Sequence, residues 1–329
     1  MSRLALTLAL LAACSACSKG EPASGGAPTP AKFKVALLSP GPVSDAGWNA
    51  LAYEGLLAIR DQLGAEIAQV QTKTPAEFEA GFRDFGRRGF NLVFGHGFEF
   101  QDAAAAVAPD FPKTVFITTS GNTVRANVAP LRFMLEEATY LEGMLTATMS
   151  KTEKAGAVGG MAIPSVKSTI LAYEAGAKSV NPKFEVVSSY VGNWDDVGAA
   201  KEASLALIGQ GADVLFHNAD AAGLGVLQAA AERSVWAFGA NKDQNAIAPD
   251  VVLASAVIDI PRAFLTVARQ VQDGSFVARV EKLGMKDGVV SLVYNPALVQ
   301  RIPADAKARV DAAQQQILSG QLTVPSVEF

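Results

Sequence analysis

From residue 32 onward the chain alternates short apolar, often β-branched runs with longer stretches of helical periodicity. Strands are predicted at 33–38, 67–71, 91–95, 114–118, 154–159, 185–191, 213–216, 235–239 and 251–257, with a further run at 126–133. Helices are predicted at 49–63, 75–88, 101–108, 167–180, 199–210, 223–232 and 261–273, with another ending near residue 151. Such alternation predicts right-handed βαβ crossovers and parallel sheets.

The rhythm restarts near Lys154, and each of its two halves is close to domain size. This pattern predicts an α/β protein with two doubly wound parallel-sheet lobes rather than one large sheet. We expect lobe 1 to contain residues 32–132 and about 259–285, and lobe 2 to contain residues 133–258 and about 286–329. Chain crossings near Phe133, near Ile258 and around Leu283–Val293 would then form a hinge.

The first 31 residues have a different character. A single basic residue, Arg3, precedes an apolar run at 4–13, and this pattern predicts a secretory signal peptide over residues 1–13, too short to span a bilayer. Residues 14–31 are small, polar and rich in Gly and Pro, which predicts a flexible tether. Both cysteines of the chain, Cys14 and Cys17, lie in this region.

The string Leu11-Ala12-Ala13-Cys14 resembles the bacterial lipobox, in which Cys14 would be diacylated and become the mature N-terminus. We therefore expect a protein that is lipid-anchored at the cell membrane and faces the periplasm or the cell exterior. Cys17 is a second candidate for the lipid, and an ordinary signal peptide cleaved elsewhere is the alternative. Because the body contains no cysteine, its core must hold it together without disulfides.

Composition excludes several classes of protein. The formal net charge is −4 and the longest basic run is Arg87-Arg88, so no nucleic-acid footprint is present. His96 and His217 are far apart and have no Cys partner, so no metal site is expected. The chain has no nucleophile elbow and no phosphate-binding loop, and we expect neither an enzyme nor a cofactor. The adjacent residues Asp195 and Asp196 could be considered as a catalytic pair of carboxylates, but the side chains of neighbouring residues usually point in different directions.

Ligands of parallel sheets bind beyond the carboxyl ends of the strands, where this chain places two tryptophans. Trp48 lies beside Asp45 and Asn49, and Trp194 lies beside Asn193 and two aspartates. Two aromatic faces with polar neighbours suit a flat heterocycle held by stacking. The alternative is that each tryptophan covers the core of its lobe while Asp45 or Asp196 caps the next helix.

Several of these segments carry a resemblance to a known family. The relevant motifs are Val43–Asn49 with 52–55, Gly97-Phe98 with Asp102-Ala103, 159–164, 190–196, 210–213, 222–230 and Asp243-Gln244. In this order they are similar to the basic-membrane-protein family of ABC-transporter substrate-binding lipoproteins, whose characterised members mostly bind purine nucleosides. The resemblance implies a type I periplasmic-binding-protein fold, a monomer, and an ABC permease and ATPase as partners.

The resemblance also implies where a ligand would bind. The two stacking aromatics of the family fall on Trp48 and Trp194, with Asp45 and Asn49 near the edge of the base. The acidic residues and the lysine that hold ribose in nucleoside-binding relatives are replaced here by Ser120, Asn241 and Ile258. Charged acceptors form stronger hydrogen bonds than neutral ones, so their loss weakens the case for ribose recognition. Because both stacking aromatics remain, the resemblance implies the base of the ligand more directly than its ribose.

Three further residues are candidate ligand contacts. Asp243 belongs to the last of the matching motifs, and His96 and His217 stand at strand ends where a neutral imidazole could donate or accept. Either histidine could equally be a structural polar residue. The function expected is a lipid-anchored binding protein of an ABC importer for a purine nucleoside or nucleobase. The alternatives are a ligand-sensing lipoprotein of the same fold, or binding of another small polar solute such as a sugar.

Overall fold

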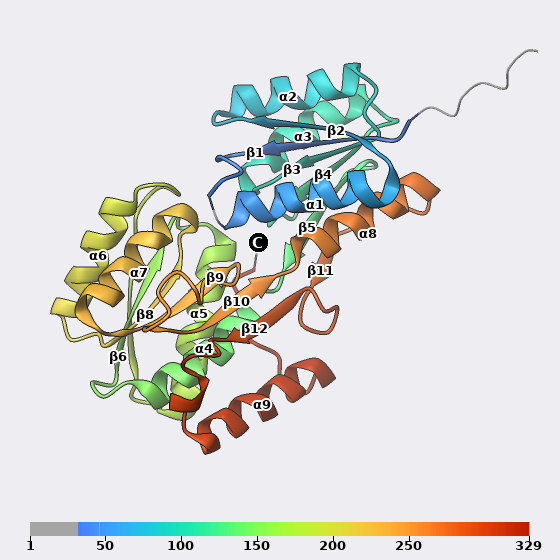
Figure 1. Cartoon of the computed structure of the whole chain (residues 1–329). Coiled ribbons are helices and arrows are strands. Elements are labelled where there is room, and N and C mark those ends of the chain that lie inside the picture. Colours follow the sequence, from blue (N-terminus) through green and yellow to red (C-terminus); the bar gives the residue numbers. More distant parts are fainter. Residues whose placement is uncertain (1–31, 46, 329) are drawn as a thin grey trace, which may run out of the picture. The chain divides into compact units, whose positions relative to one another are not determined.

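The computed structural model describes residues 32–45 and 47–328, which contain two six-stranded sheets (Figure 1). The predicted signal peptide, tether and lipidated cysteine fall on residues 1–31 and lie outside the described residues. Each sheet has helices on both of its faces, so each sheet and its helices form one lobe. The predicted α/β class with two lobes is confirmed.

The first sheet is parallel throughout, with strand order β11-β5-β4-β3-β1-β2. Its strands are β1 (Lys34–Ser39), β2 (Glu66–Gln71), β3 (Leu92–Gly95), β4 (Val115–Thr119), β5 (Val128–Phe133) and β11 (Glu281–Leu283). The central strands are buried along their whole length, as expected for a sheet covered on both faces. Helices α1 and α8 lie on one face, and α2 and α3 lie on the other (Figure 1).

The second sheet has strand order β12-β10-β9-β8-β6-β7. Its strands are β6 (Lys154–Gly159), β7 (Glu185–Tyr190), β8 (Val214–Asn218), β9 (Trp236–Asn241), β10 (Val252–Ile258) and β12 (Val290–Tyr294). Strand β12 departs from the predicted parallel pattern because it pairs antiparallel with β10. The reason is its route: the chain leaves β11 of the first sheet and enters the second sheet from the edge at which β10 ends.

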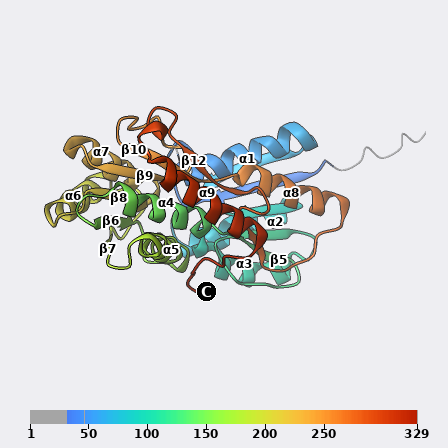
Figure 2. The same ribbon diagram turned by 90° about the horizontal axis from the view of Figure 1, so that it is seen from below.

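The helices agree with the sequence pattern except at the C-terminus. They are α1 (Trp48–Leu63), α2 (Pro75–Arg87), α3 (Gln101–Val107), α4 (Glu136–Met149), α5 (Pro164–Val180), α6 (Val197–Gly209), α7 (Gly223–Arg233), α8 (Ile260–Asp273) and α9 (Ala304–Ser319). The described residues also contain short 3₁₀ turns: η1 (Phe98–Phe100), η2 (Ala108–Asp110), η3 (Asp220–Ala222) and η4 (Val299–Arg301). The sequence reading did not predict α9, which packs against α4 of the second lobe (Figure 2).

Helix ends follow local sequence signals. Helix α2 begins with a capping box, in which the Thr74 hydroxyl accepts from the Glu77 N–H and the Glu77 carboxylate accepts from the Thr74 N–H. Helix α1 ends at Gly64, whose φ of 65° is the left-handed conformation that glycine adopts without strain. These local signals mark the start of α2 and the end of α1.

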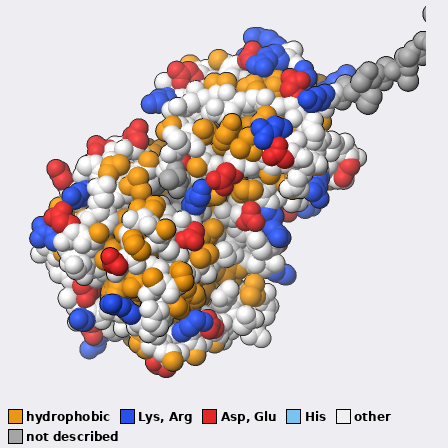
Figure 3. Space-filling view, in the orientation of Figure 1, with side chains coloured by type: hydrophobic (Ala, Val, Ile, Leu, Met, Phe, Trp, Pro, Cys, Tyr) orange, Lys and Arg blue, Asp and Glu red, His pale blue; other side chains and the backbone are white. Residues whose placement is uncertain are grey.

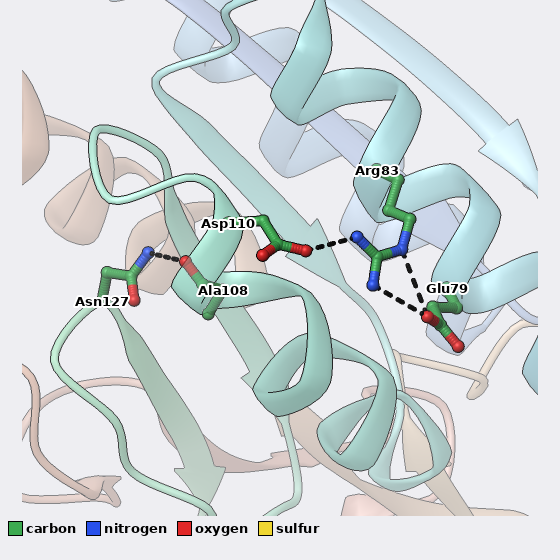
Figure 4. Close-up of polar contacts among 5 residues, drawn as sticks. All are labelled: Glu79, Arg83, Ala108, Asp110 and Asn127. Atoms are coloured by element: carbon green, nitrogen blue, oxygen red, sulfur yellow. Dashed lines mark hydrogen bonds and ion pairs between the residues drawn. The ribbon is translucent and has the colours of Figure 1, made fainter.

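Polar contacts hold the chain between α2 and β5 (Figure 4). Arg83 donates to Glu79 on its own helix and to Asp110 in η2. The Asn127 amide donates to the carbonyl oxygens of Ala108, Phe111 and Thr114, at 3.1, 3.1 and 2.8 Å. Exposed ion pairs contribute little to stability, so the Asn127 amide is the stronger constraint on this turn.

The surface carries charges of both signs. On the face seen in Figure 3, acidic and basic side chains are interspersed, with no continuous basic stripe. Within residues 32–45 and 47–328, no helix has the length and apolar character needed to cross a membrane.

Helices α4 and α5 of the second lobe cross with their backbones in contact. A Cβ atom on Gly143 would lie 1.9 Å from the Tyr173 carbonyl oxygen, and one on Gly176 would lie 1.9 Å from the Tyr140 carbonyl oxygen. No side chain fits at either position without separating the helices. The two glycines therefore set the distance between α4 and α5.

We expect Gly176→Ala to lower the free energy of unfolding by about 1–3 kcal/mol, because the added methyl group forces the two helices apart. Gly209→Ala, at the end of α6, is the matched control, since a Cβ there meets nothing within 4 Å. The control should be neutral or stabilising by about 0.5–1 kcal/mol, as expected for replacing glycine in a helix. Urea unfolding of both variants measures the difference, and equal effects would contradict the close crossing.

Candidate ligand-binding site

A pocket, partly open to solvent, lies where the carboxyl ends of strands from both sheets meet. The first sheet contributes residues that follow β1, β3, β4 and β5, and the second contributes residues that follow or end β6, β7, β8, β9 and β10. The lining residues are Pro40, Trp48, Gly97, Phe98, Glu99, Ser120, Phe133, Leu135, Ile163, Ser165, Val166, Thr169, Trp194, Asn218, Asp220, Asn241 and Ile258.

Four of the predicted site residues line this pocket: Trp48, Ser120, Trp194 and Asn241. The two tryptophans come from loops of different sheets, so the pocket has an aromatic side chain on each of its two walls. The other five, Asp45, Asn49, His96, His217 and Asp243, are not among the lining residues. Several of them instead support residues that do line the pocket.

His96 lies behind Trp48. The two rings are stacked with centroids 4.1 Å apart and an interplanar angle of 22°. The Nε2 atom of His96 donates to the Trp48 carbonyl oxygen at 3.0 Å, and Nδ1 accepts from the Thr119 hydroxyl at 3.3 Å. Complete burial lowers the pKa of His96 to about 3, so the imidazole is neutral. His96 therefore fixes the position of the indole, and the edge of Phe133 supports it from another side.

Asp45 and Asn49 are located at the start of α1. The Asp45 carboxylate accepts from the backbone N–H groups of Gly47, Asn49 and Ala50 and from the Asn49 side-chain amide, at 2.7–3.0 Å. These contacts satisfy amide groups at the beginning of the helix, where no intrahelical partner exists. They match the helix-capping alternative for Asp45 and hold Trp48, the first residue of α1, in place.

Trp194 is held by its own loop. The Asn193 side-chain oxygen accepts from the backbone N–H groups of Asp195 and Asp196, and Asp196 in turn caps α6 through the Ala199 N–H. A Cβ atom on Gly160 would lie 2.4 Å from a carbon of the Trp194 ring, so only glycine admits the indole at this place. The loop and Gly160 together direct Trp194 to the pocket.

His217 and Asp243 lie away from the pocket. His217 is buried, its Nε2 donates to the Gln244 side-chain oxygen at 2.9 Å, and its Nδ1 has no partner. Burial lowers the pKa of His217 to about 4, so this imidazole is also neutral. Asp243 is exposed and accepts from the Asn245 N–H. Both residues organise the loop after β9.

A chain of hydrogen bonds runs along the second-lobe wall. Asn241 donates to Asn218 at 3.4 Å, Asn218 donates to Thr169 at 3.1 Å, and Thr169 donates to the Val166 carbonyl oxygen at 2.8 Å. The chain fixes the orientation of both amides. Asn241 has a φ of 69°, a left-handed conformation that asparagine tolerates better than most residues.

Sequence reasoning missed the acidic residues of the pocket, Glu99 and Asp220. Asp220, from the loop after β8, accepts from the Trp48 N–H at 3.1 Å and from the Asn49 amide at 3.3 Å. Burial and the nearby Asp45 carboxylate raise the pKa of Asp220 well above its usual value. Burial also raises the pKa of Glu99. Asp220 lies in a loop that the strand-end rule indicates, but only the tertiary structure brings it to α1.

Carboxyl and amide groups are prominent among the polar groups of the pocket. Its lining includes the carboxyl groups of Glu99 and Asp220 and the amides of Asn218 and Asn241, but neither Lys nor Arg. Across the described part of the chain, no group of three or more His, Cys, Asp or Glu residues is arranged to hold a metal ion. The pocket therefore offers carboxyl acceptors, amide groups that donate and accept, and aromatic faces to a ligand.

Comparison with known proteins identifies the family. Residues 32–328 match the family described as ABC transporter substrate-binding protein PnrA-like. The chain is 30% identical over 301 residues to a purine-binding protein of Brucella abortus (91% of this chain and 84% of that protein). It is 29% identical over 307 residues to a protein of Haloferax volcanii named as an ABC transporter glucose-binding protein (92% and 77%).

Among solved structures, a solute-binding protein of an ABC transporter system from Aeropyrum pernix has the same fold. Its TM-score is 0.83 at 24% identity, and the match covers 90% of this chain and 94% of that chain. With the family match over nearly the whole described body, the chain belongs to the PnrA-like family of ABC transporter substrate-binding proteins. The resemblance drawn from the sequence motifs is confirmed.

The buried His96 predicts a specific pH dependence of stability. The unfolded state takes up a proton near pH 6.5, whereas the folded state does so only near pH 3, so stability is lost as the pH falls through this window. His96→Gln keeps an N–H donor but does not titrate. Between about pH 6 and pH 4, its free energy of unfolding should fall less steeply than that of the wild type, by about 1.4 kcal/mol per pH unit.

Urea unfolding at several pH values measures this difference. The range from pH 7 to pH 8 is the internal control, since neither state of His96 titrates there and the two curves should run parallel. Parallel curves below pH 6 as well would mean that His96 is protonated in the folded protein.

Proposed function

We propose that this protein is the lipid-anchored substrate-binding component of an ABC importer and that its ligand is a purine, as nucleobase or nucleoside. The observation that carries the proposal is the pair of tryptophans, one from each lobe, that line a single pocket. Trp48 is covered by His96 on one face, which leaves its other face for a flat ligand. The similarity to a purine-binding relative supports the same ligand class.

Fewer observations support recognition of a ribose than recognition of the base. Ser120, Asn241 and Ile258 line the pocket. By the family resemblance, they stand in place of the charged residues that hold ribose in nucleoside-binding relatives. Neutral groups form weaker hydrogen bonds to hydroxyls than carboxylates do. We therefore propose that a free base loses less affinity relative to its nucleoside here than in relatives that retain the acidic residues.

Stacking predicts the effect of removing either tryptophan. Base–aromatic stacking contributes about 1–3 kcal/mol per base, so Trp48→Ala and Trp194→Ala should each weaken purine binding about five- to a hundred-fold. Trp236→Phe is the control, because Trp236 begins β9 and does not line the pocket. Calorimetry with adenine, guanine, hypoxanthine and their nucleosides measures the affinities.

The same titrations include glucose and amino acids as rival ligands. Glucose is included because one relative is named as a glucose-binding protein. Binding of a sugar or an amino acid, together with no binding of any purine, would contradict the stacking proposal and leave the family membership intact.

Closure of the two lobes is part of the proposal. Lobe 1 would comprise residues 32–132 and about 259–285, and lobe 2 residues 133–258 and about 286–329, with the hinge at the three crossings between the sheets. Because the pocket lining is divided between the lobes, a ligand that contacts both walls favours the closed arrangement. X-ray scattering during the titration tests this, since the ligand should reduce the radius of gyration.

We propose that Cys14 carries the lipid and holds the protein at the cell membrane, facing the periplasm or the cell exterior. Its partners would be an ABC permease and ATPase, with the binding protein acting as a monomer. The rival is a ligand-sensing lipoprotein with the same pocket. Uptake of labelled purine that depends on this protein favours import, whereas a transcriptional response without uptake favours sensing.

Anchoring predicts that Cys14→Ser releases the protein into the soluble fraction or leaves the precursor unprocessed. A single acyl chain anchors weakly, whereas the several chains of a lipoprotein attach a protein stably. Membrane fractionation with labelled palmitate measures attachment, and Cys17→Ser is the matched control that should remain lipidated. Unchanged labelling of the Cys14 variant would point to Cys17 or to another mode of attachment.

A further inference from the structure

Asp220 connects the two lobes at the wall of the pocket. It follows β8 of the second sheet, yet its Oδ1 accepts from the Trp48 N–H at 3.1 Å and its Oδ2 accepts from the Asn49 amide at 3.3 Å, both at the start of α1 in the first lobe. A Cβ atom on Gly47 would lie 3.0 Å from Oδ1, so this approach depends on a residue without a side chain. Asp220 also lines the pocket.

The backbone of Asp220 is itself unusual. Its φ is 53°, in the left-handed region that is strained for most residues other than glycine. Such conformations persist where the surroundings hold them, and they concentrate at ligand sites. In Asp220, the hydrogen bonds from Trp48 and Asn49 at the start of α1 help to hold this backbone conformation.

The hydrogen-bonding capacity of Asp220 exceeds what the protein uses. A carboxyl group has about four lone pairs; the two donors of α1 occupy two of them, and a side-chain hydrogen bond also joins Asp220 to Asp45. No Lys or Arg is among the residues that line the pocket, and a second carboxyl group, Glu99, lines it as well. The third nearby carboxylate, Asp45, is bonded to the same Asn49 amide nitrogen at 2.7 Å. The raised pKa of Asp220 fits a proton shared with Asp45, so toward the pocket the remaining lone pairs of Asp220 can only accept, and their donor must come from the ligand.

We propose that Asp220 determines specificity by accepting a hydrogen bond from an exocyclic amino group of the bound heterocycle, so that the pocket selects amino-substituted purines. The inference rests on the proposed function, because it names the ligand class of that same pocket. An amino group offers two N–H donors and suits a wall of carboxyl groups. A carbonyl oxygen or a phosphate at this place would face acceptors only and would be rejected.

The same contact links selectivity to closure. Asp220 comes from the second lobe and Asp45 from the first, and the proximity of the two carboxyl groups opposes their approach. A ligand N–H on Asp220 offsets this repulsion and stabilises the arrangement in which Asp220 contacts α1. A heterocycle without the amino group lacks this effect even if it stacks equally well on the tryptophans.

The test uses ligand pairs that differ only in the amino group: adenine against unsubstituted purine, and adenosine against purine riboside. We expect the wild-type protein to bind the amino member of each pair about tenfold more tightly, as one additional hydrogen bond in the pocket provides. Asp220→Gly should reduce this ratio several-fold or more, towards one. Glycine adopts a φ of 53° without strain, so this variant keeps the loop conformation.

Asp220→Asn and Asp243→Asn complete the set. Asp220→Asn retains one neutral acceptor and should give an intermediate ratio. Asp243→Asn, an exposed carboxylate of the same lobe that does not line the pocket, should keep the wild-type ratio. Melting temperatures of the ligand-free variants establish that each is folded.

The outcomes separate this inference from the proposed function. If purines bind but the wild-type ratio is near one, or if Asp220→Gly weakens both members of a pair equally, the role assigned to Asp220 is wrong and the purine site stands. If no purine binds to the wild type, the proposed function fails and the role of Asp220 fails with it. A ratio that falls only in the Asp220 variants supports the inference.

Discussion

Parallel strand pairing is the constraint on which the rest of this structure depends. Because parallel strands all end at the same edge of a sheet, each lobe collects its functional loops at one edge. The two edges meet at the pocket, so residues as distant in the sequence as Trp48 and Asn241 line the same space. Strand β12, which pairs antiparallel with β10, does not disturb this arrangement, since it lies at the edge of the second sheet and contributes no lining residue.

The two tryptophans that line the pocket are each held rigidly, but by different contacts. Trp48 is fixed by the His96 ring behind it and by the Asp45 carboxylate at the start of its helix. Trp194 is fixed by the absence of a side chain at Gly160. Neutral, buried imidazoles suit this supporting role because they pack as flat rings and still donate a hydrogen bond in a definite direction. A stacking surface held in this way loses little conformational freedom when a ligand binds.

The polar side chains that line the pocket restrict which ligands can bind there. Amides at Asn218 and Asn241 are oriented by a chain of hydrogen bonds, and two carboxyl groups face the same space without a cation. Family membership is consistent with several ligand classes, since relatives are named for purine and for glucose binding. The identity of the ligand therefore depends on these few side chains rather than on the fold.

The sequence by itself determined the order of strands and helices up to Asp273, the two-lobed class and the family, because hydrophobic periodicity and loop motifs are local signals. It also placed Trp48, Ser120, Trp194 and Asn241 at strand ends. It missed helix α9, Glu99 and Asp220. Only the tertiary structure decided which strand-end residues face the pocket: the side chains of Asp45 and His96 turn to helix α1 and to Trp48, whereas Asp220 crosses to the other lobe. The Asp45 contact lies within four residues of the chain and agrees with the helix-capping alternative that the sequence offered. The contacts of His96 and Asp220 with Trp48 join residues 48 and 172 positions apart, and no local pattern in the chain encodes them.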